Sequence, residues 1–284
     1  MQPEVAPVPA PEVPAPEPRP FKLHRRFDRT GRLIGDAGME RLSHARVVVF
    51  GLGGVGSYAV EGLVRSGVGY LKLVDFDVVC VTNSNRQLHA TVSTVGKSKA
   101  ELLALRCKQI NPDVVVESVQ DFYRDEVSEQ MLAGHWDFVV DAIDNVRAKL
   151  HLLNACVQRG LKVVSSMGAA GRLDPTAIRI EDLCETHMDQ FAKDIRKLLK
   201  RKHGVDTSRP TGITAVYSIE PRREPISLRY DAATEGFACV CPHGENEFNS
   251  CEHKNQIDGS AAFVTSVFGM NIAGVVVRRI AQGR

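Results

Sequence analysis

The feature that most constrains the fold is a glycine-rich segment between an apolar run and a segment of helical periodicity. Residues 46–50 read RVVVF, and GLGGVG follows at once. Consecutive β-branched residues favour a buried strand, and residues 57–66 carry apolar side chains at helical spacing. Gly51, Gly53 and Gly56 have the spacing of a phosphate-binding turn, which needs a tight bend, a close approach of phosphate and close helix–strand packing. The segment predicts a nucleotide site without identifying the nucleotide.

Strand-like and helix-like segments continue to alternate up to Gly168. We expect further strands at 70–75, 114–119, 137–141 and 162–165, and further helices at 97–110 and 148–159. This alternation predicts an α/β fold with a Rossmann-like, mostly parallel sheet and helices on both faces. Beyond Gly168 the pattern is less regular. We expect a smaller, irregular C-terminal part there, apart from helices at 188–203 and 262–281.

Proline marks the start of the folded part. Eight of the fourteen prolines lie in residues 1–20. Because proline cannot donate a backbone hydrogen bond, this stretch is expected to be a disordered arm. Residues 21–284 are expected to form a single domain, in which 184–260 form an insertion that faces the substrate.

Composition narrows the compartment and the partners. Seven cysteines, mostly isolated, do not make a disulfide framework, so a reducing, cytoplasmic location is expected. The apolar run 263–277 is short for a bilayer and contains polar residues, so we interpret it as a packed helix and expect no membrane span. The formal net charge is only +2, and any nucleic-acid surface must therefore be local.

Charged residues after the second expected strand favour a nucleoside triphosphate. Asp75 ends that strand, where a carboxylate can accept hydrogen bonds from ribose hydroxyls, and Asp77 follows it. Polar and cationic residues come next, at Asn83, Arg86 and Lys99. A triphosphate carries more charge than the diphosphate of a dehydrogenase cofactor, so Arg86 and Lys99 suit a neutralising clamp. The alternative is a surface ion pair for Arg86 and a solvated Lys99.

The strand expected at 137–141 also ends in polar residues, in DFVVDAIDN. Ligands of open parallel sheets bind at this carboxyl edge. Asp144 can hold Mg²⁺, which prefers oxygen ligands, and Asn145 can reach a neighbouring phosphate or ribose. Either residue can instead cap the next helix, and Asp144 is well placed to do so.

These motifs, in this order, resemble the E1-like adenylating enzymes. The resemblance is carried by Arg26-Phe27-x-Arg29, GLGGVG, LVDFD, TNSNRQ, the helix lysine and DAIDN, and it extends from about residue 21 to the C-terminal helix. It implies an E1-like ATP-binding domain. The loop from Gly51 to Gly56, with Gly53 and Gly54, would line the phosphates of ATP.

The same resemblance implies roles for the charged residues. Asp75 would bind the ribose, and phosphates would be held by Asn83, Arg86 and Lys99. Asp144 would position magnesium. In this superfamily an N-terminal arginine crosses a homodimer interface to the neighbour's ATP, and Arg29 matches that place, with Arg26 as the other candidate. The implied catalytic residues are Arg86, Lys99, Asp144 and Arg29, and Asp77 and Asn145 complete the nucleotide-binding set.

Other segments separate the branches of the superfamily. Activators of sulfur-carrier proteins typically carry two CxxC pairs for zinc, and none occurs in this chain. The segments NRQLHA, NVRAKL, GAAGRLDPTAIRIEDL, VDTSRPTGITAVYSIE and GSAAFVTSVFGMNIAG are instead similar to the tRNA threonylcarbamoyladenosine dehydratases. This similarity implies ATP-dependent cyclisation of the threonylcarbamoyl group on adenosine 37 of tRNA, next to the anticodon. Bacterial relatives work with a cysteine desulfurase system, and fungal ones are associated with mitochondria, which is the alternative location.

The tRNA needs a cationic surface. One predicted helix has an apolar stripe and carries six outward cations, Lys193, Arg196, Lys197, Lys200, Arg201 and Lys202. Phosphate contacts by this helix would make binding strongly salt-dependent. A solvated charged face is the alternative, and the family resemblance favours contact with tRNA.

A cysteine-rich loop offers a second possible metal site. Cys239, Cys241, Cys251 and His253 are soft ligands that suit zinc. The CxC spacing is narrower than in most structural zinc sites, so free thiols or a disulfide stay open as alternatives.

Three other classes of function stay open. The chain could activate a sulfur-carrier or ubiquitin-like protein, and exchange of pyrophosphate driven by a small carrier protein would identify that class. It could be an NAD-dependent oxidoreductase, which tight binding of NADH without ATP would identify. A non-catalytic nucleotide-binding scaffold is the third.

Overall fold

Seven strands form one sheet in the order β3-β2-β1-β4-β5-β7-β6. The computed structural model describes residues 21–228 and 258–284. The strands are β1 Arg46–Phe50, β2 Tyr70–Val74, β3 Val115–Val119, β4 Phe138–Asp141, β5 Val163–Ser166, β6 Ile178–Asp182 and β7 Ile213–Ser218. All neighbouring pairs are parallel except β6 and β7. The predicted Rossmann-like sheet is confirmed.

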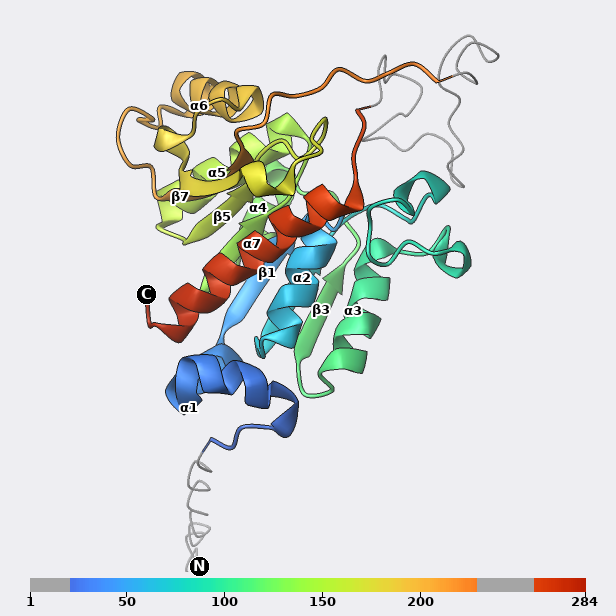
Figure 1. Cartoon of the computed structure of the whole chain (residues 1–284). Helices are drawn as coiled ribbons and strands as arrows, with labels where there is room; N and C mark the ends of the chain where they lie inside the picture. Colours follow the sequence, from blue (N-terminus) through green and yellow to red (C-terminus); the bar gives the residue numbers. More distant parts are fainter. Residues whose placement is uncertain (1–20, 229–257) are drawn as a thin grey trace, which may run out of the picture.

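Helices cover both faces of the sheet (Figure 1). They are α1 Asp28–His44, α2 Gly56–Arg65, α3 Lys99–Ile110, α4 Asp125–Met131, α5 Val146–Arg159, α6 Gln190–His203 and α7 Ala262–Ala281. Short 3-10 turns occur at η1 Arg25–Phe27, η2 Val81–Asn83, η3 Val92–Thr94, η4 Pro175–Ala177 and η5 Leu183–Glu185. Figure 1 shows α7 lying in front of the sheet beside α2, while α1 lies below the amino ends of the strands.

The described part of the protein has two hydrophobic clusters, one on each face of the sheet, because successive side chains of β1 point to opposite faces. Val47 and Val49 pack with the apolar sides of α2, α3 and α7. Val48 and Phe50 pack on the other face, with residues of α5 and α6. All four side chains are fully buried, as expected for a central parallel strand.

Helix α7 is long and apolar enough to cross a membrane by length and composition. Half of its most apolar window is buried, and it packs against α2 and α1. Its bounds are those expected from the sequence, and so is its packing in the core.

Four elements were not expected from the sequence. Helix α1 contains three glycines, and Gly35 interrupts it with φ +73°. Helix α4 is short, and β6 and β7 lie in the part expected to be irregular. Strand β7 falls within the range 184–260 and pairs with β5 in the main sheet. The arm 1–20 and the stretch 229–257 lie outside the described residues.

Candidate nucleotide and RNA site

The sheet has its topological switch point between β1 and β4. The chain continues from β1 to β2 on one side and from β4 to β5 on the other. Such a point leaves a crevice at the carboxyl ends of the two strands, where ligands of open α/β sheets bind. The glycine loop follows β1, and Ala142 to Asp144 follow β4. The N–H of Ala142 donates to Phe50 O at 2.8 Å, so the two segments lie together.

Gly51, Gly53 and Gly56 of the loop are each needed for a different structural reason. Gly51 has φ +84°, and a Cβ there would lie 2.6 Å from Ala142 O. A Cβ on Gly56 would lie 1.8 Å from Gly51 O, so α2 can pack on the loop only without a side chain. Gly53 is open, because the nearest atom to its Cβ position is Gln87 Nε2 at 3.7 Å. The loop therefore fits a phosphate that approaches the backbone at Gly53.

Asp75 is tied to this loop. Its Oδ2 accepts from Leu52 N at 2.6 Å, and its Oδ1 accepts from Asp77 N at 2.8 Å. Burial raises the pKa of its carboxyl group, and the charge of Lys99 opposes that rise. Each carboxylate oxygen has a second lone pair, so Asp75 can still accept a hydrogen bond from a ribose hydroxyl.

Lys99 is the first residue of α3 and is only 4% exposed. Its Nζ lies 2.8 Å from Asp77 Oδ2. A cation at a helix start opposes the helix dipole, and Asp75 and Asp77 offset this. Burial alone would lower the pKa of Lys99, but these carboxylates outweigh it and the pKa is raised. Lys99 is therefore a charged ammonium at neutral pH, close to Asp75, whose carboxylate is hydrogen-bonded to the glycine loop.

Arg86 lies against the same loop. Its Cγ is 3.2 Å from the Cβ position of Gly54. Its Nη1 donates to Thr82 O at 3.0 Å and to Asn85 Oδ1 at 3.1 Å. Burial lowers the pKa of its guanidinium group, and the charge of Asp144 acts against that decrease. The structure thus brings Arg86 and Asp144 within electrostatic reach of each other.

Two asparagines of the expected set have capping roles. Asn83 is buried, and its Oδ1 accepts from Cys80 N at 3.0 Å within η2. Asn145 is the N-cap of α5, and its Oδ1 accepts from Ala148 N at 3.1 Å. The cap at this helix is therefore Asn145, whereas the sequence had favoured Asp144. Asp144 itself is exposed and makes no hydrogen bond or ion pair with the described part of the chain. Its free carboxylate fits an oxygen ligand for Mg²⁺.

Arg29 lies at the opposite end of the sheet. It is exposed on α1, and α1 is tied to the amino ends of the strands, since Gly69 N donates to Leu42 O at 2.9 Å. The glycine loop is at the carboxyl ends (Figure 1). Within one chain Arg29 cannot reach the nucleotide site. The alternative, Arg26, donates to Asn111 Oδ1 at 3.0 Å at the same end.

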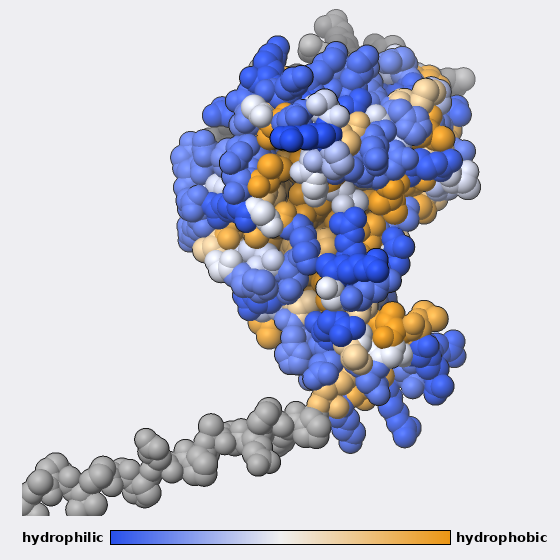
Figure 2. All heavy atoms as spheres, turned by 90° about the vertical axis from the view of Figure 1, so that its left-hand side faces the viewer, coloured by the Kyte–Doolittle hydropathy of each residue, from blue (hydrophilic) through white to orange (hydrophobic). Residues whose placement is uncertain are grey.

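Five of the six cations expected to bind tRNA are exposed on α6: Lys193, Lys197, Lys200, Arg201 and Lys202. Arg196 differs, because its Nη1 donates to Thr186 O at 2.6 Å and to Leu183 O at 3.3 Å. It anchors α6 to the preceding loop. Figure 2 shows hydrophilic side chains crowded over the upper part of the face on which α6 lies, with apolar patches between them and α1.

Sequence reasoning missed a buried ion pair beneath the site. Lys149 Nζ lies 2.5 Å from Asp141 Oδ2 and also donates to Ser166 O at 3.0 Å. Both charged side chains are at most 1% exposed. Lys149 falls on the apolar stripe of α5 with Leu152, Leu153 and Cys156, and a lysine in such a stripe was the available signal.

His89 is a second residue that was missed. It is 6% exposed, and neither ring nitrogen has a hydrogen-bond partner. Burial, with a smaller contribution from the charge of Lys99, lowers its pKa to about 4. The imidazole beside the site is therefore neutral at pH 7.

The possible zinc ligands Cys239, Cys241, Cys251 and His253 lie outside the described residues. Among residues 21–228 and 258–284, no three His, Cys, Asp or Glu side chains are grouped to hold a metal ion.

Comparison with known proteins identifies the family. The ThiF family model matches residues 27–282. The tRNA threonylcarbamoyladenosine dehydratase of Bacillus subtilis is 42% identical over 255 residues, which are 90% of this chain and 94% of that protein. The crystal structure of the Escherichia coli tRNA N6-threonylcarbamoyladenosine dehydratase in complex with ATP has a TM-score of 0.77 and 34% identity. Its complex with AMP has a TM-score of 0.78. Each covers 91% of this chain and is itself 95% covered.

The motifs at the switch point, the fold and these likenesses over nearly the whole chain agree. The chain belongs to the ThiF family of E1-like enzymes and, within it, to the tRNA threonylcarbamoyladenosine dehydratases.

Proposed function

We propose that this chain uses ATP to adenylate the carboxylate of the threonylcarbamoyl group on adenosine 37 of tRNA, and then closes that group into a ring. The observation that carries the proposal is the cluster of Arg86, Lys99 and Asp144 around the glycine loop. Three charged groups at this loop suit a triphosphate better than a redox dinucleotide. The ATP and AMP complexes of the E. coli relative support the same nucleotide.

The chemistry requires activation because a carboxylate is a poor acyl electrophile. A carboxylate oxygen attacks the α-phosphorus of ATP, and the bond to pyrophosphate breaks. The resulting acyl-adenylate is then attacked by a nucleophilic atom of the same side chain. AMP leaves with the former carboxylate oxygen, a proton is lost, and the net change is loss of water from the modified nucleoside. Ring closure is intramolecular, so a covalent cysteine is not needed.

The protein's own contribution is charge neutralisation and positioning. Lys99 and Arg86 would offset the charge that develops on the phosphates. Asp144 would hold Mg²⁺, which supplies further neutralisation when bound. Asp75 would fix the ribose, and the open backbone at Gly53 would receive the phosphates. In this arrangement Asn83 and Asn145 support the site mainly as caps. Asn83 caps the turn that precedes Arg86, and Asn145 caps the start of α5.

Two surfaces of the chain suggest its partners, the exposed cations of α6 and the arginine on α1. Exposed cations of α6 would bind phosphates of the tRNA near position 37. Because Arg29 is at the amino end of the sheet, it can act on ATP only from a second copy, so the proposal includes a homodimer. A cytoplasmic location and a cysteine desulfurase partner remain predictions, tested by fractionation and co-purification.

The decisive experiment is mass spectrometry of tRNA nucleosides after incubation with ATP and Mg²⁺. The wild-type protein should convert the threonylcarbamoyl nucleoside to a product lighter by one water. Lys99→Met and Arg86→Ala should each lose at least about 100-fold in rate, as is typical when a stabilising charge is removed. Lys108→Ala, on the exposed side of α3, is the matched control and should keep full rate.

Two results would contradict the proposal. Release of pyrophosphate driven by a small carrier protein and not by tRNA would point to a carrier-protein activator. Tight binding of NADH without ATP would point to an oxidoreductase.

A further inference from the structure

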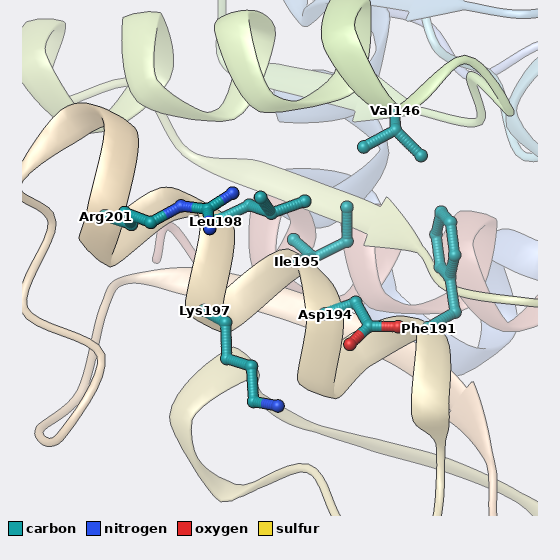
Figure 3. Close-up of a pocket in the computed structure, with 7 residues that line it drawn as sticks. All are labelled: Val146, Phe191, Asp194, Ile195, Lys197, Leu198 and Arg201. Atoms are coloured by element: carbon teal, nitrogen blue, oxygen red, sulfur yellow. The ribbon is translucent and has the colours of Figure 1, made fainter.

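A cavity of about 630 Å³ lies between α5 and α6 (Figure 3). Three apolar side chains line it, Val146, Phe191 and Leu198, with Ile195 beneath them. Charged groups complete the wall, at Asp194, Lys197 and Arg201. The volume is within the range of sites that enclose small organic ligands.

The cavity opens at the same edge of the sheet as the nucleotide site. Val146 is the first residue of α5 and directly follows Asn145, which follows Asp144. On the other side, Phe191 lies over the end of β5, because its Cβ is 3.3 Å from the Cβ position of Gly168. Figure 3 shows Val146 and Phe191 facing each other from the two helices. A ligand in this cavity therefore has one end close to the proposed Mg²⁺ ligand.

The lining suits a nucleotide rather than a purely apolar ligand. Proteins that read single-stranded RNA stack unpaired bases on aromatic side chains, and phosphates pair with lysine and arginine. Phe191 supplies the aromatic surface, and Lys197 and Arg201 supply the cations. Asp194, whose Oδ1 accepts from Gln190 Nε2 at 2.9 Å, can also accept from a ribose hydroxyl or an exocyclic amine. Its negative charge disfavours a longer run of phosphates, so one nucleotide fits better than a backbone groove.

We propose that this cavity receives nucleotide 37 of the tRNA, turned out of the anticodon loop, with its base against Phe191 and its flanking phosphates at Lys197 and Arg201. The inference deepens the proposed function and rests on it. Enzymes that modify a base commonly extrude it into a pocket, because the reacting atoms are otherwise inaccessible. In this position the modified side chain of the base would lie at the Val146 side of the cavity, the side nearest Asp144.

The other cations of α6 do not line this cavity. Lys193 and Arg196 line a smaller cavity with His187 and Asp189, on a different side of the helix. Arg196 is committed to the carbonyl groups of the preceding loop. Lys197 and Arg201 are thus the exposed cations of α6 that line the α5–α6 cavity, and they can be tested as a pair.

The test uses the full chain, ATP, Mg²⁺ and an anticodon stem-loop RNA that carries the threonylcarbamoyl nucleoside at position 37. Phe191→Ala should lower kcat/KM for the RNA by about 10- to 100-fold, the usual effect of removing one base–aromatic stack. Phe191→Trp should restore most of it, since a larger aromatic ring can stack in its place. The Kd for ATP should stay within twofold in both variants, which also reports that they are folded.

A second pair of measurements does not depend on Phe191. Lys197→Ala combined with Arg201→Ala should raise KM for the RNA by at least about tenfold. It should also reduce the slope of log KM against log salt by about 1.4, the value for two phosphate contacts on a single strand. Lys108→Ala, on a helix of the opposite face, is the charge control and should change neither.

The failures of the two proposals are distinguishable. If the wild-type protein makes no cyclic product on this RNA, the proposed function is wrong. If the wild type is active while Phe191→Ala keeps kcat/KM within twofold, or the double variant keeps its salt slope, only the base pocket is wrong. A loss in Phe191→Ala that Phe191→Trp does not restore, with ATP binding intact, would also overturn stacking as its role.

Discussion

His89 should make the protein sensitive to mild acid, and replacing it by leucine should remove that sensitivity. His89 is only 6% exposed, and no described residue hydrogen-bonds its ring nitrogens. Burial first, and the charge of Lys99 second, lower its pKa from 6.5 to about 4. Protonation would place an unpaired cation in a dry site beside a second cation. The folded state therefore favours the neutral ring.

The sign and the size of the change in folding stability follow from proton linkage. Between pH 6.5 and 4 the unfolded chain binds a proton that the folded chain excludes, so folding stability falls as the pH falls. Above pH 6.5 the contribution is fully present. At pH 5 the loss is about 2 kcal/mol, and it approaches about 3 kcal/mol below pH 4. Typical domains are stable by about 5–15 kcal/mol, so a loss of this size is readily measured.

The assay is urea unfolding at pH 7.5 and at pH 5.0, with the free energy of unfolding extrapolated to water. The difference between the two pH values should be about 2 kcal/mol smaller in His89→Leu than in the wild type. Contributions of other titrating groups cancel in this comparison. His135→Gln is the control, because the His135 side chain is 77% exposed, and it should behave as the wild type. If His89→Leu keeps the wild-type pH difference, the neutral buried imidazole is not the cause and the reasoning fails.

Two further substitutions test the framework of the site. Lys149→Met leaves Asp141 buried without its partner and should lower the free energy of unfolding by about 3–5 kcal/mol, whereas adding Asp141→Asn should recover part of the loss. Denaturant unfolding measures both, and a loss below about 1 kcal/mol would mean that the pair is not buried as described. Gly51→Ala places a methyl group 2.6 Å from Ala142 O at φ +84° and should abolish ATP binding in a calorimetric titration. Gly160→Ala, at φ +64° with open space around it, should reduce stability modestly and leave the Kd for ATP unchanged.

The sequence predicted most of the sheet because its first strands are short runs made mostly of apolar residues, with β-branched valines in β1 and β4. Residues 46–50 and 137–141 have no helical periodicity to compete with, and glycine or polar residues end each run. The order of charged residues after each strand also placed Arg86, Lys99 and Asp144 at one edge, since parallel strands all end there. These were inferences from connectivity, which a single sequence carries well.

Other features depend on contacts between segments that are distant along the chain, and local sequence periodicity does not predict such contacts. The sequence shows a lysine on an apolar stripe of α5, but only the fold places Asp141 beneath it. Arg196 reads as one more cation of α6, yet it is committed to Thr186 and Leu183. Strand β7 was missed for a related reason. Its neighbours β5 and β6 are distant along the chain, so its place in the sheet is set by pairing that short-range patterns do not report.

The pairing of Lys99 with Asp77 decides how the site can work. Lys99 Nζ carries three N–H groups, and the structure commits one of them to Asp77 Oδ2 at 2.8 Å. Two donors remain, so a phosphate can be bound without breaking the ion pair. The carboxylates also keep this buried ammonium charged at the start of α3, where the helix dipole and burial both oppose it. We therefore propose Asp77 as a positioning residue: its carboxylate hydrogen-bonds the Lys99 ammonium and, together with the charge of Asp75, favours the charged form of Lys99.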